Sequence, residues 1–340
     1  MQLRTLGSTG IQVSSLCLGT MMFGDWGNRD AADCARIVHR AMDSGVNFID
    51  TADRYSLGQS EEIVGRALVG RRDDVVLATK FGNPMGDDPN HRGASRRWIV
   101  RAVENSLRRL GTDYIDLYQI HRPDYATPLD ETLAALTDLV HSGKVRAIGS
   151  STFPASMVAE AHWRAERRGG QRFATEQPPY SLLQRGIESE LLPVTQRYGM
   201  GVIVWSPLSQ GWLTGRFRAG SPLPDTRRAS WNARVFDMST DENRRRMDAV
   251  TALGDLADDV GISLIHLALA FVIRHPGVTA AIMGPRTIEQ LDSQLDAADL
   301  RIPEHVLDRI DEIVPPGTDV VPSERYATAD PLFAREARRR

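Results

Sequence analysis

Lysine is almost missing from this chain. Of its 340 residues 41 are basic, and only Lys80 and Lys144 among them are lysines. Arginine can supply a surface charge equally well, whereas an ammonium group is compact and has a pKa that burial and neighbours can tune. A lysine that remains is therefore a candidate for a position where a guanidinium cannot substitute.

Cysteine, long apolar runs and excess positive charge are also scarce. Cys17 and Cys34 are the only cysteines, too few for a disulfide framework or a cysteine-rich metal site. No apolar stretch approaches the roughly 18 to 20 residues that span a bilayer, and the N-terminus carries no charged and apolar leader. The net charge of -3 is unfavourable for binding nucleic acid or an anionic membrane. We therefore expect a soluble, cytoplasmic protein with neither as partner; the sequence does not indicate an oligomeric state.

Short apolar runs end in polar or small residues eight times along the chain, and segments of helical length separate them. The residues at these transitions are Gly19, Asp50, Lys80, His121, Gly149, Gln177, Trp205 and Gly284. Strands separated by helices imply parallel pairing through right-handed crossovers, and eight of them imply a closed barrel. The predicted fold is an α/β protein, a (β/α)8 TIM barrel in one domain over residues 1–340, with an N-terminal β-hairpin that turns at residues 7–10.

One connection departs from this alternation. The Gly-, Pro- and Arg-rich segment between Gly215 and Arg246, after the seventh strand, is too long for an ordinary connection. Its arginines could grip a phosphorylated or nucleotide-linked sugar, or the segment could be a solvated loop. The arginines in question are Arg216, Arg218, Arg227, Arg228 and Arg234. One helix is predicted over residues 241–274, and residues 315–340 are predicted to form an extended tail.

Four side chains of complementary chemistry fall at the carboxyl ends of predicted strands, where TIM barrels build their active sites. Asp50, Lys80 and His121 end three strands, and Tyr55 lies on the loop after the first. A free phenol has a pKa of about 10 and loses its proton poorly, and a nearby ammonium lowers that pKa. Lys80 can supply this charge, Asp50 can hold the ammonium, and His121 can orient a carbonyl oxygen. Together these side chains would form a general acid that protonates a developing alkoxide. They include no reductant, so the hydride must come from a cofactor.

The sequence lacks the signals of two other kinds of site, a Rossmann dinucleotide-binding domain and a metal site. No G-x-G-x-x-G follows a strand, so a Rossmann domain loses its main support. Asp50, Asp53 and His121 could be considered metal ligands, but no H-x-H or similar paired spacing accompanies them. We expect no metal.

Several of these residues together resemble a known family. They are the run DTADRY from Asp50 to Tyr55, Gly58, Ser60 and Glu61, then Lys80, His121, Gln177 and the segment WSPLSQGWLTG from Trp205 to Gly215. The pattern is similar to that of the aldo-keto reductase superfamily, in particular to long-loop bacterial members related to the potassium-channel β-subunit branch. The likeness extends from about Leu3 to Val314. It implies a barrel that binds NADPH without a Rossmann domain, and a catalytic tetrad of Asp50, Tyr55, Lys80 and His121 with Tyr55 as proton donor.

The resemblance also implies how NADPH would be held. Trp205 would stack on the nicotinamide, and Ser151 and Gln177 would hold its carboxamide. The pyrophosphate would lie along Ser206, Pro207, Leu208, Gly211 and Gly215, and the adenosine end along Gly284, Arg286, Gln290 and Gln294, with Gly19, Thr20, Met21, Asp50 and Ser150 completing the site. Where the family usually has Asn after the serine, this chain has Thr152, and Ser293-Gln294 stands where it usually has Glu-Asn. Arg286 favours NADP over NAD, because a cation near a helix N-terminus becomes favourable when a bound anion lies between them.

The leading hypothesis is an NADPH-dependent reductase of a small-molecule aldehyde or ketone. Three alternatives stay open. The chain could be a cofactor-holding, redox-sensing binding subunit, as some members of the superfamily are. It could reduce keto-sugar nucleotides in a deoxysugar pathway. It could also form a Schiff base on Lys80, as barrel aldolases do.

Overall fold

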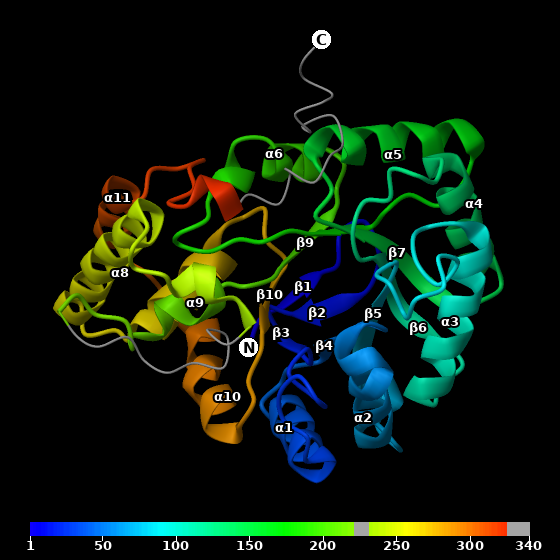
Figure 1. Ribbon diagram of the computed structural model, residues 1–340, viewed down its shortest axis with the longest axis horizontal. Coiled ribbons are helices and arrows are strands. Elements are labelled where there is room, and N and C mark those ends of the chain that lie inside the picture. The colour runs from blue at the N-terminus through cyan, green and yellow to red at the C-terminus, as the bar shows by residue number, and fades with distance from the viewer. Residues whose placement is uncertain (221–230, 325–340) are drawn as a thin grey trace.

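Eight parallel strands form a closed barrel in the computed structural model, which describes residues 1–220 and 231–324 (Figure 1). Their order around the barrel is β10-β3-β4-β5-β6-β7-β8-β9. The strands are β3 (Leu16–Gly19), β4 (Phe48–Asp50), β5 (Val76–Phe81), β6 (Ile115–Ile120), β7 (Val145–Ser151), β8 (Thr175–Gln177), β9 (Gly201–Val204) and β10 (Ala280–Met283). The predicted (β/α)8 barrel is confirmed.

Helices surround the barrel (Figure 1). They are α1 (Ala31–Asp43), α2 (Gln59–Ala67), α3 (Arg96–Leu110), α4 (Leu129–His141), α5 (Ala155–Arg168), α6 (Leu191–Arg197), α8 (Asp241–Asp259), α9 (Leu264–Arg274), α10 (Ile288–Leu295) and α11 (Glu304–Ile313). In α3 the sequence marks both ends: the Ser95 side chain accepts a hydrogen bond from the Trp98 backbone N–H, and Gly111 follows the last turn with a left-handed φ of 62°.

The predicted N-terminal hairpin is present, and its flanking residues pack into the amino end of the barrel. Strands β1 (Leu3–Thr5) and β2 (Gln12–Ser14) pair antiparallel. Leu6 and Val13 are fully buried in one cluster with lumen residues such as Phe48 and Leu117. The amino end of the barrel is therefore filled by packed apolar side chains.

Strand periodicity places a polar layer above this apolar floor. Residues two apart on a strand face the same side, so Asp50 follows Phe48, and Gln119 follows Leu117, on the lumen side. Lys80 follows Ala78 in the same way on β5. The barrel thus changes from apolar to polar near the carboxyl ends of its strands.

The prediction of one helix over residues 241–274 is wrong. The segment forms two helices, α8 and α9, bent by 96° across a short break. Gly261 has a left-handed φ of 68° in this break, and the Ser263 side chain caps α9 by accepting from the His266 backbone N–H. In the part of the chain that the structure describes, no single helix meets the length and composition of a membrane span, although this bent pair meets them jointly.

The long connection after the seventh strand is confirmed in part. In its described portion Phe217 and Phe236 stack on Trp212, which precedes the connection, with ring centroids 4.4 and 5.6 Å from that of Trp212. Arg227 and Arg228 lie outside the described residues, as do residues 325–340 of the predicted tail. Residues 315–324 do not extend freely: the Arg185 backbone N–H donates to Thr318 O at 2.9 Å.

Candidate active site

A buried ion pair forms the base of the polar layer. Lys80 Nζ lies 2.5 Å from Asp50 Oδ1 and donates a second hydrogen bond to the Thr51 carbonyl at 2.9 Å. Lys80 is fully buried and Asp50 is 1% exposed. Removing one partner of such a pair generally costs about 3–5 kcal/mol, because the other charge is left buried alone. The two strand ends that carry Asp50 and Lys80 are therefore fixed relative to each other.

Tyr55 reaches this pair from the loop after β4. Its hydroxyl lies 3.2 Å from Lys80 Nζ, and its ring packs edge-on against His121 with centroids 5.7 Å apart. Ser56, Leu57 and Gly58 all have positive φ angles of 48°, 55° and 98°. This unusual run turns the chain sharply from Tyr55 into α2.

Burial and charge set the protonation states of these groups. Burial raises the pKa of Tyr55, and the Lys80 ammonium opposes this rise without overcoming it. Burial alone would lower the pKa of Lys80, but the Asp50 carboxylate and the Tyr55 hydroxyl raise it above its ordinary value. Burial, together with Lys80 and Arg122, holds the pKa of His121 well below its usual range. At neutral pH the site therefore combines a neutral phenol, an ammonium and a neutral imidazole.

Gln119 also belongs to the cluster, although it was not predicted from the sequence. It is fully buried, and its amide nitrogen lies 3.3 Å from Asp50 Oδ2, which also accepts from Gln177 Nε2 at 2.9 Å. The available signal was a polar residue near the end of β6, two positions before His121 and so on the same face. Asp50 is thus held by Lys80 on one oxygen and by two amides on the other.

The segment after β9, which the resemblance places along the pyrophosphate, has an unusual backbone. Ser206, Ser209 and Gln210 have left-handed φ angles of 59°, 46° and 57°, and Gly211 and Gly215 have φ angles of 104° and 77°. A Cβ atom added at either glycine would meet nothing within 4 Å. The N–H groups of Ser209 and Gly211 donate to the carbonyls of Ser206 and Leu208 at 2.8 and 2.9 Å, and that of Gln210 donates to Ser206 Oγ at 3.1 Å. These three N–H groups are thus used within the turn, and the contact of this segment with a pyrophosphate stays a prediction. Pro207 is buried and Leu208 half-buried beside it.

Residues predicted for the adenosine end gather at the start of α10. The Arg286 backbone N–H donates to Gln290 Oε1 at 2.9 Å, and Gln294 Nε2 donates to the Gln290 carbonyl at 2.6 Å. Gly284 is exposed, with open space around its Cα. Among the described residues the half-buried Arg286 forms no ion pair with a carboxylate, so its guanidinium is available for an added anion.

The remaining predicted contacts divide into two groups. Ser151 Oγ donates to the Gln177 carbonyl at 2.8 Å, and Gly19 lies beside Asp50 in the strand register. The half-buried Met21 follows β3. Side chains of Ser150 and Thr20 are turned to other partners: Ser150 Oγ donates to Glu176 Oε2 at 2.5 Å, and Thr20 Oγ1 lies 2.9 Å from Ser60 Oγ. Only their backbones are left to contact a cofactor.

Thr152, which replaces the usual Asn, has a strained backbone. Its φ of 57° is left-handed, a region that β-branched residues rarely enter. Such strain costs on the order of 1–3 kcal/mol and persists only where neighbours hold it. The loop between β7 and α5 is therefore under constraint next to the predicted carboxamide contacts.

Asp53 points away from the cluster. Both carboxylate oxygens are buried without a hydrogen bond among the described residues, and burial followed by Glu61 raises the pKa of Asp53 well above its usual range. The side chain lines a cavity of about 190 Å³ beside Trp98 and Arg109. In the part of the chain that is described, no group of three or more His, Cys, Asp or Glu side chains is placed to hold a metal ion.

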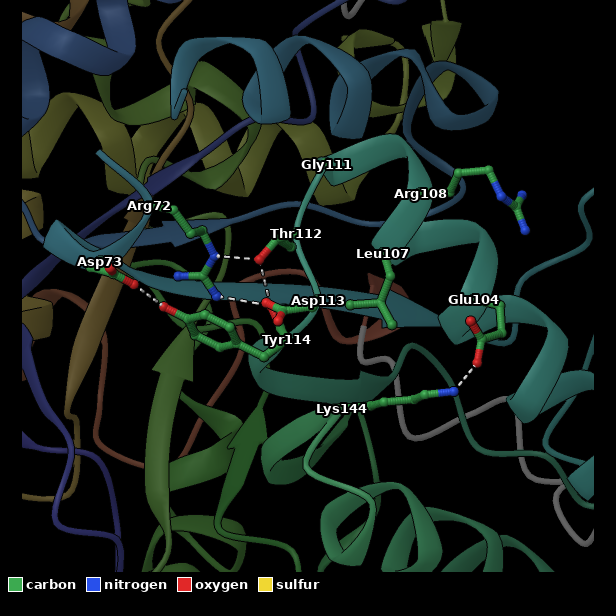
Figure 2. A pocket seen from close by; sticks show the side chains of 10 residues that line it. All are labelled: Arg72, Asp73, Glu104, Leu107, Arg108, Gly111, Thr112, Asp113, Tyr114 and Lys144. Atoms are coloured by element: carbon green, nitrogen blue, oxygen red, sulfur yellow. Dashed lines mark hydrogen bonds and ion pairs between the residues drawn. The ribbon is translucent and has the colours of Figure 1, made fainter. Parts of the chain in front are cut away.

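A larger cavity, of about 780 Å³, contains none of the predicted site residues; Figure 2 shows the side chains that line it. It is lined by Arg72, Asp73, Glu104, Leu107, Arg108, Gly111, Thr112, Asp113, Tyr114 and Lys144. These residues surround the end of α3 and the start of β6, at the amino end of the strands. Lys144 is paired with Glu104, and the Tyr114 hydroxyl donates to Asp73 at 2.6 Å. The predicted tetrad lies at the opposite end of the barrel.

The fold and the polar cluster define a class of proteins, the parallel (β/α)8 barrels with reactive groups at the carboxyl ends of their strands. A family model described as "Aldo/keto reductase family" matches residues 15–315. The chain is 39% identical to "Uncharacterized oxidoreductase YrpG" of Bacillus subtilis, over 96% of this chain and 100% of that protein. It is 35% identical to a "Probable voltage-gated potassium channel subunit beta" of Arabidopsis thaliana, over 92% and 97% of the two chains. It is 36% identical to "Aldo-keto reductase YhdN" of Bacillus subtilis, over 86% and 87%.

The chain therefore belongs to the aldo-keto reductase family. It is an oxidoreductase of a family that generally uses NAD(P)H, and the resemblance given by its strand-end residues is confirmed.

Proposed function

We propose that this protein reduces an aldehyde or ketone to an alcohol with NADPH, and that Tyr55 donates the proton. The observation that carries the proposal is one continuous set of contacts at the barrel mouth. Asp50 holds Lys80 at 2.5 Å, Lys80 lies 3.2 Å from the Tyr55 hydroxyl, and His121 packs against the Tyr55 ring.

Each side chain has a distinct task in this reaction. Tyr55 gives its proton to the carbonyl oxygen, and the Lys80 ammonium stabilises the phenolate that remains. His121 is neutral at physiological pH, so its single N–H can donate a hydrogen bond that orients the carbonyl and stabilises the developing alkoxide. Asp50 keeps the ammonium in place. NADPH, when bound, would supply the hydride that the carbonyl carbon receives.

Two of the alternatives find less support in the site. A lysine must be neutral to attack a carbonyl, and the raised pKa of Lys80 beside Asp50 keeps it charged. For a keto-sugar nucleotide, the long loop would have to offer free arginines. Of its described arginines, Arg218 already pairs with Asp258 at 3.0 Å and lies 3.5 Å from Asp255. This leaves the exposed Arg216 and Arg234 for such a ligand.

A cofactor-holding subunit is the second candidate, favoured by one observation. The chain is similar over 92% of its length to a probable potassium channel β subunit. The exchange rate of bound NADPH separates this candidate from a reductase. A subunit that senses redox state would release the cofactor very slowly and show negligible turnover.

The direct test is a panel of aldehydes, ketones, pyridoxal and keto-sugars assayed with NADPH, with absorbance followed at 340 nm. We expect at least one class of carbonyl to give turnover within the usual range of about 1–10³ s⁻¹. If NADPH binds but no carbonyl accelerates its oxidation, the reductase proposal is wrong and the binding subunit takes its place.

Arg286 is expected to set the preference for NADPH. Replacing it by Ala should raise the Kd for NADPH about tenfold, the equivalent of about 1.4 kcal/mol, and change the Kd for NADH by less than about twofold. The reason is that only NADPH carries the additional phosphate that a guanidinium binds well. Isothermal titration calorimetry measures both constants. Arg301→Ala, the same change at an exposed surface position, serves as control, and an equal loss for both cofactors would contradict the assignment.

A further inference from the structure

Arg122 joins the ends of three barrel strands. Its Nη1 donates to the carbonyl of His121, at the end of β6, at 3.0 Å, and to Thr152 Oγ1, just after β7, at 3.2 Å. Its guanidinium carbon lies 5.7 Å from the ring centroid of Trp205, directly after β9. The resemblance places the nicotinamide against residues of these same strand ends.

Glu176 holds the same loop from the outer side of the barrel. This fully buried carboxyl group accepts from the Phe153 backbone N–H at 3.0 Å, and its other oxygen lies 2.5 Å from Ser150 Oγ. Ser150 and Phe153 bracket Ser151 and Thr152. The loop is therefore fixed on one side by a carboxyl group and on the other by a guanidinium.

Thr152 is the residue that needs such support. Its left-handed φ of 57° is one that Asn or Gly adopts readily and that a β-branched residue disfavours. The Thr152 side chain also donates to the carbonyl of Ser151 at 2.7 Å. A chain with Thr at this position requires external contacts to keep the loop shape that Asn would hold by its own preference.

We propose that Arg122 and Glu176 are positioning residues that hold Thr152 in its left-handed conformation and thereby keep the loop of Ser151 and Thr152 shaped for the nicotinamide end of the cofactor. The inference rests on the proposed function only in taking this loop as part of the cofactor site. Neither residue takes part in proton transfer.

A double-mutant cycle tests the proposal through cofactor binding rather than activity. We expect Arg122→Met to raise the Kd for NADPH about tenfold in the natural background. In the background of Thr152→Asn, which adopts the left-handed conformation unaided, the same change should cost less than about threefold. Calorimetry on the purified full chain gives the four constants.

Arg146→Met is a matched control. Arg146 also donates to a carbonyl, that of Gly143, and its guanidinium lies 4.8 Å from the Tyr114 ring centroid, but at the amino end of the barrel. The Kd of the Arg146→Met variant for NADPH should equal that of the natural protein. An equal penalty for Arg122→Met in both backgrounds would overturn the proposal, because it would indicate a direct or purely electrostatic contact. So would a change of less than about twofold in the natural background. If the natural protein itself fails to bind NADPH, the proposed function fails instead.

Discussion

Tyr55→Phe is expected to lower kcat for carbonyl reduction by about 10²- to 10⁴-fold, the usual contribution of a positioned general acid. The substitution removes only the hydroxyl that lies 3.2 Å from Lys80 Nζ. Lys80 keeps its contacts with Asp50 and the Thr51 carbonyl, so the ion pair and the fold should survive. We therefore expect the Kd for NADPH to stay within about threefold of the natural protein. Steady-state kinetics at 340 nm and calorimetry separate the two effects.

Tyr118→Phe is the matched control for this change. Tyr118 is fully buried on β6, and among the described residues its hydroxyl forms no hydrogen bond. Removing an unsatisfied buried hydroxyl leaves no lost partner, so kcat and stability should match or exceed those of the natural protein. Full activity of Tyr55→Phe beside an unchanged Tyr118→Phe would show that another group donates the proton.

Much of this site was predictable because barrel geometry converts sequence order into position. Asp50, Lys80 and His121 each follow a short apolar run, and parallel strands in a barrel bring such ends together. The structure places Lys80 in contact with both Asp50 and Tyr55. The alternation of strands and loops was therefore enough to predict this proximity.

The sequence did not show which way single side chains point, or which of two opposed effects on a pKa is the larger. Ser150 and Ser151 are neighbours in a polar run, yet Ser150 faces Glu176 while Ser151 contacts the Gln177 backbone. The periodicity of a strand is visible in sequence, but the face that meets the lumen depends on register. The pKa of Tyr55 is a similar case: Lys80 was predicted to lower it, and burial outweighs that effect.

The missed helix break and the missed role of Arg122 have different causes. An apolar pattern of helical period continues through Gly261, and a single glycine in such a pattern is tolerated often enough to be overlooked. The break itself carries local signals, the left-handed Gly261 and the N-cap Ser263. Arg122 directly follows His121 in the sequence, yet its partners Thr152 and Trp205 become neighbours only when the barrel closes.

Glu176→Gln is expected to change how stability depends on pH. Burial raises the pKa of Glu176 from 4.5 to about 8 in the folded chain. Between these two values the folded protein keeps a proton that the unfolded chain has released, so the free energy of unfolding falls as pH rises through this window. At about 1.36 kcal/mol for each unit of pKa, the full loss is about 5 kcal/mol by pH 8.

Glutamine does not ionise and therefore avoids this loss. Its amide oxygen can accept from the Phe153 backbone N–H and its amide nitrogen can donate to Ser150 Oγ, so both anchors of the loop are kept. Relative to the natural protein, Glu176→Gln should gain little stability near pH 4.5 and several kcal/mol by pH 8 to 9. Denaturant unfolding at pH 5 and pH 9 measures the difference, with Glu62→Gln on the exposed face of α2 as a control that follows the natural protein. A stability difference that is the same at both pH values would mean that Glu176 ionises as easily in the folded chain as in the unfolded one.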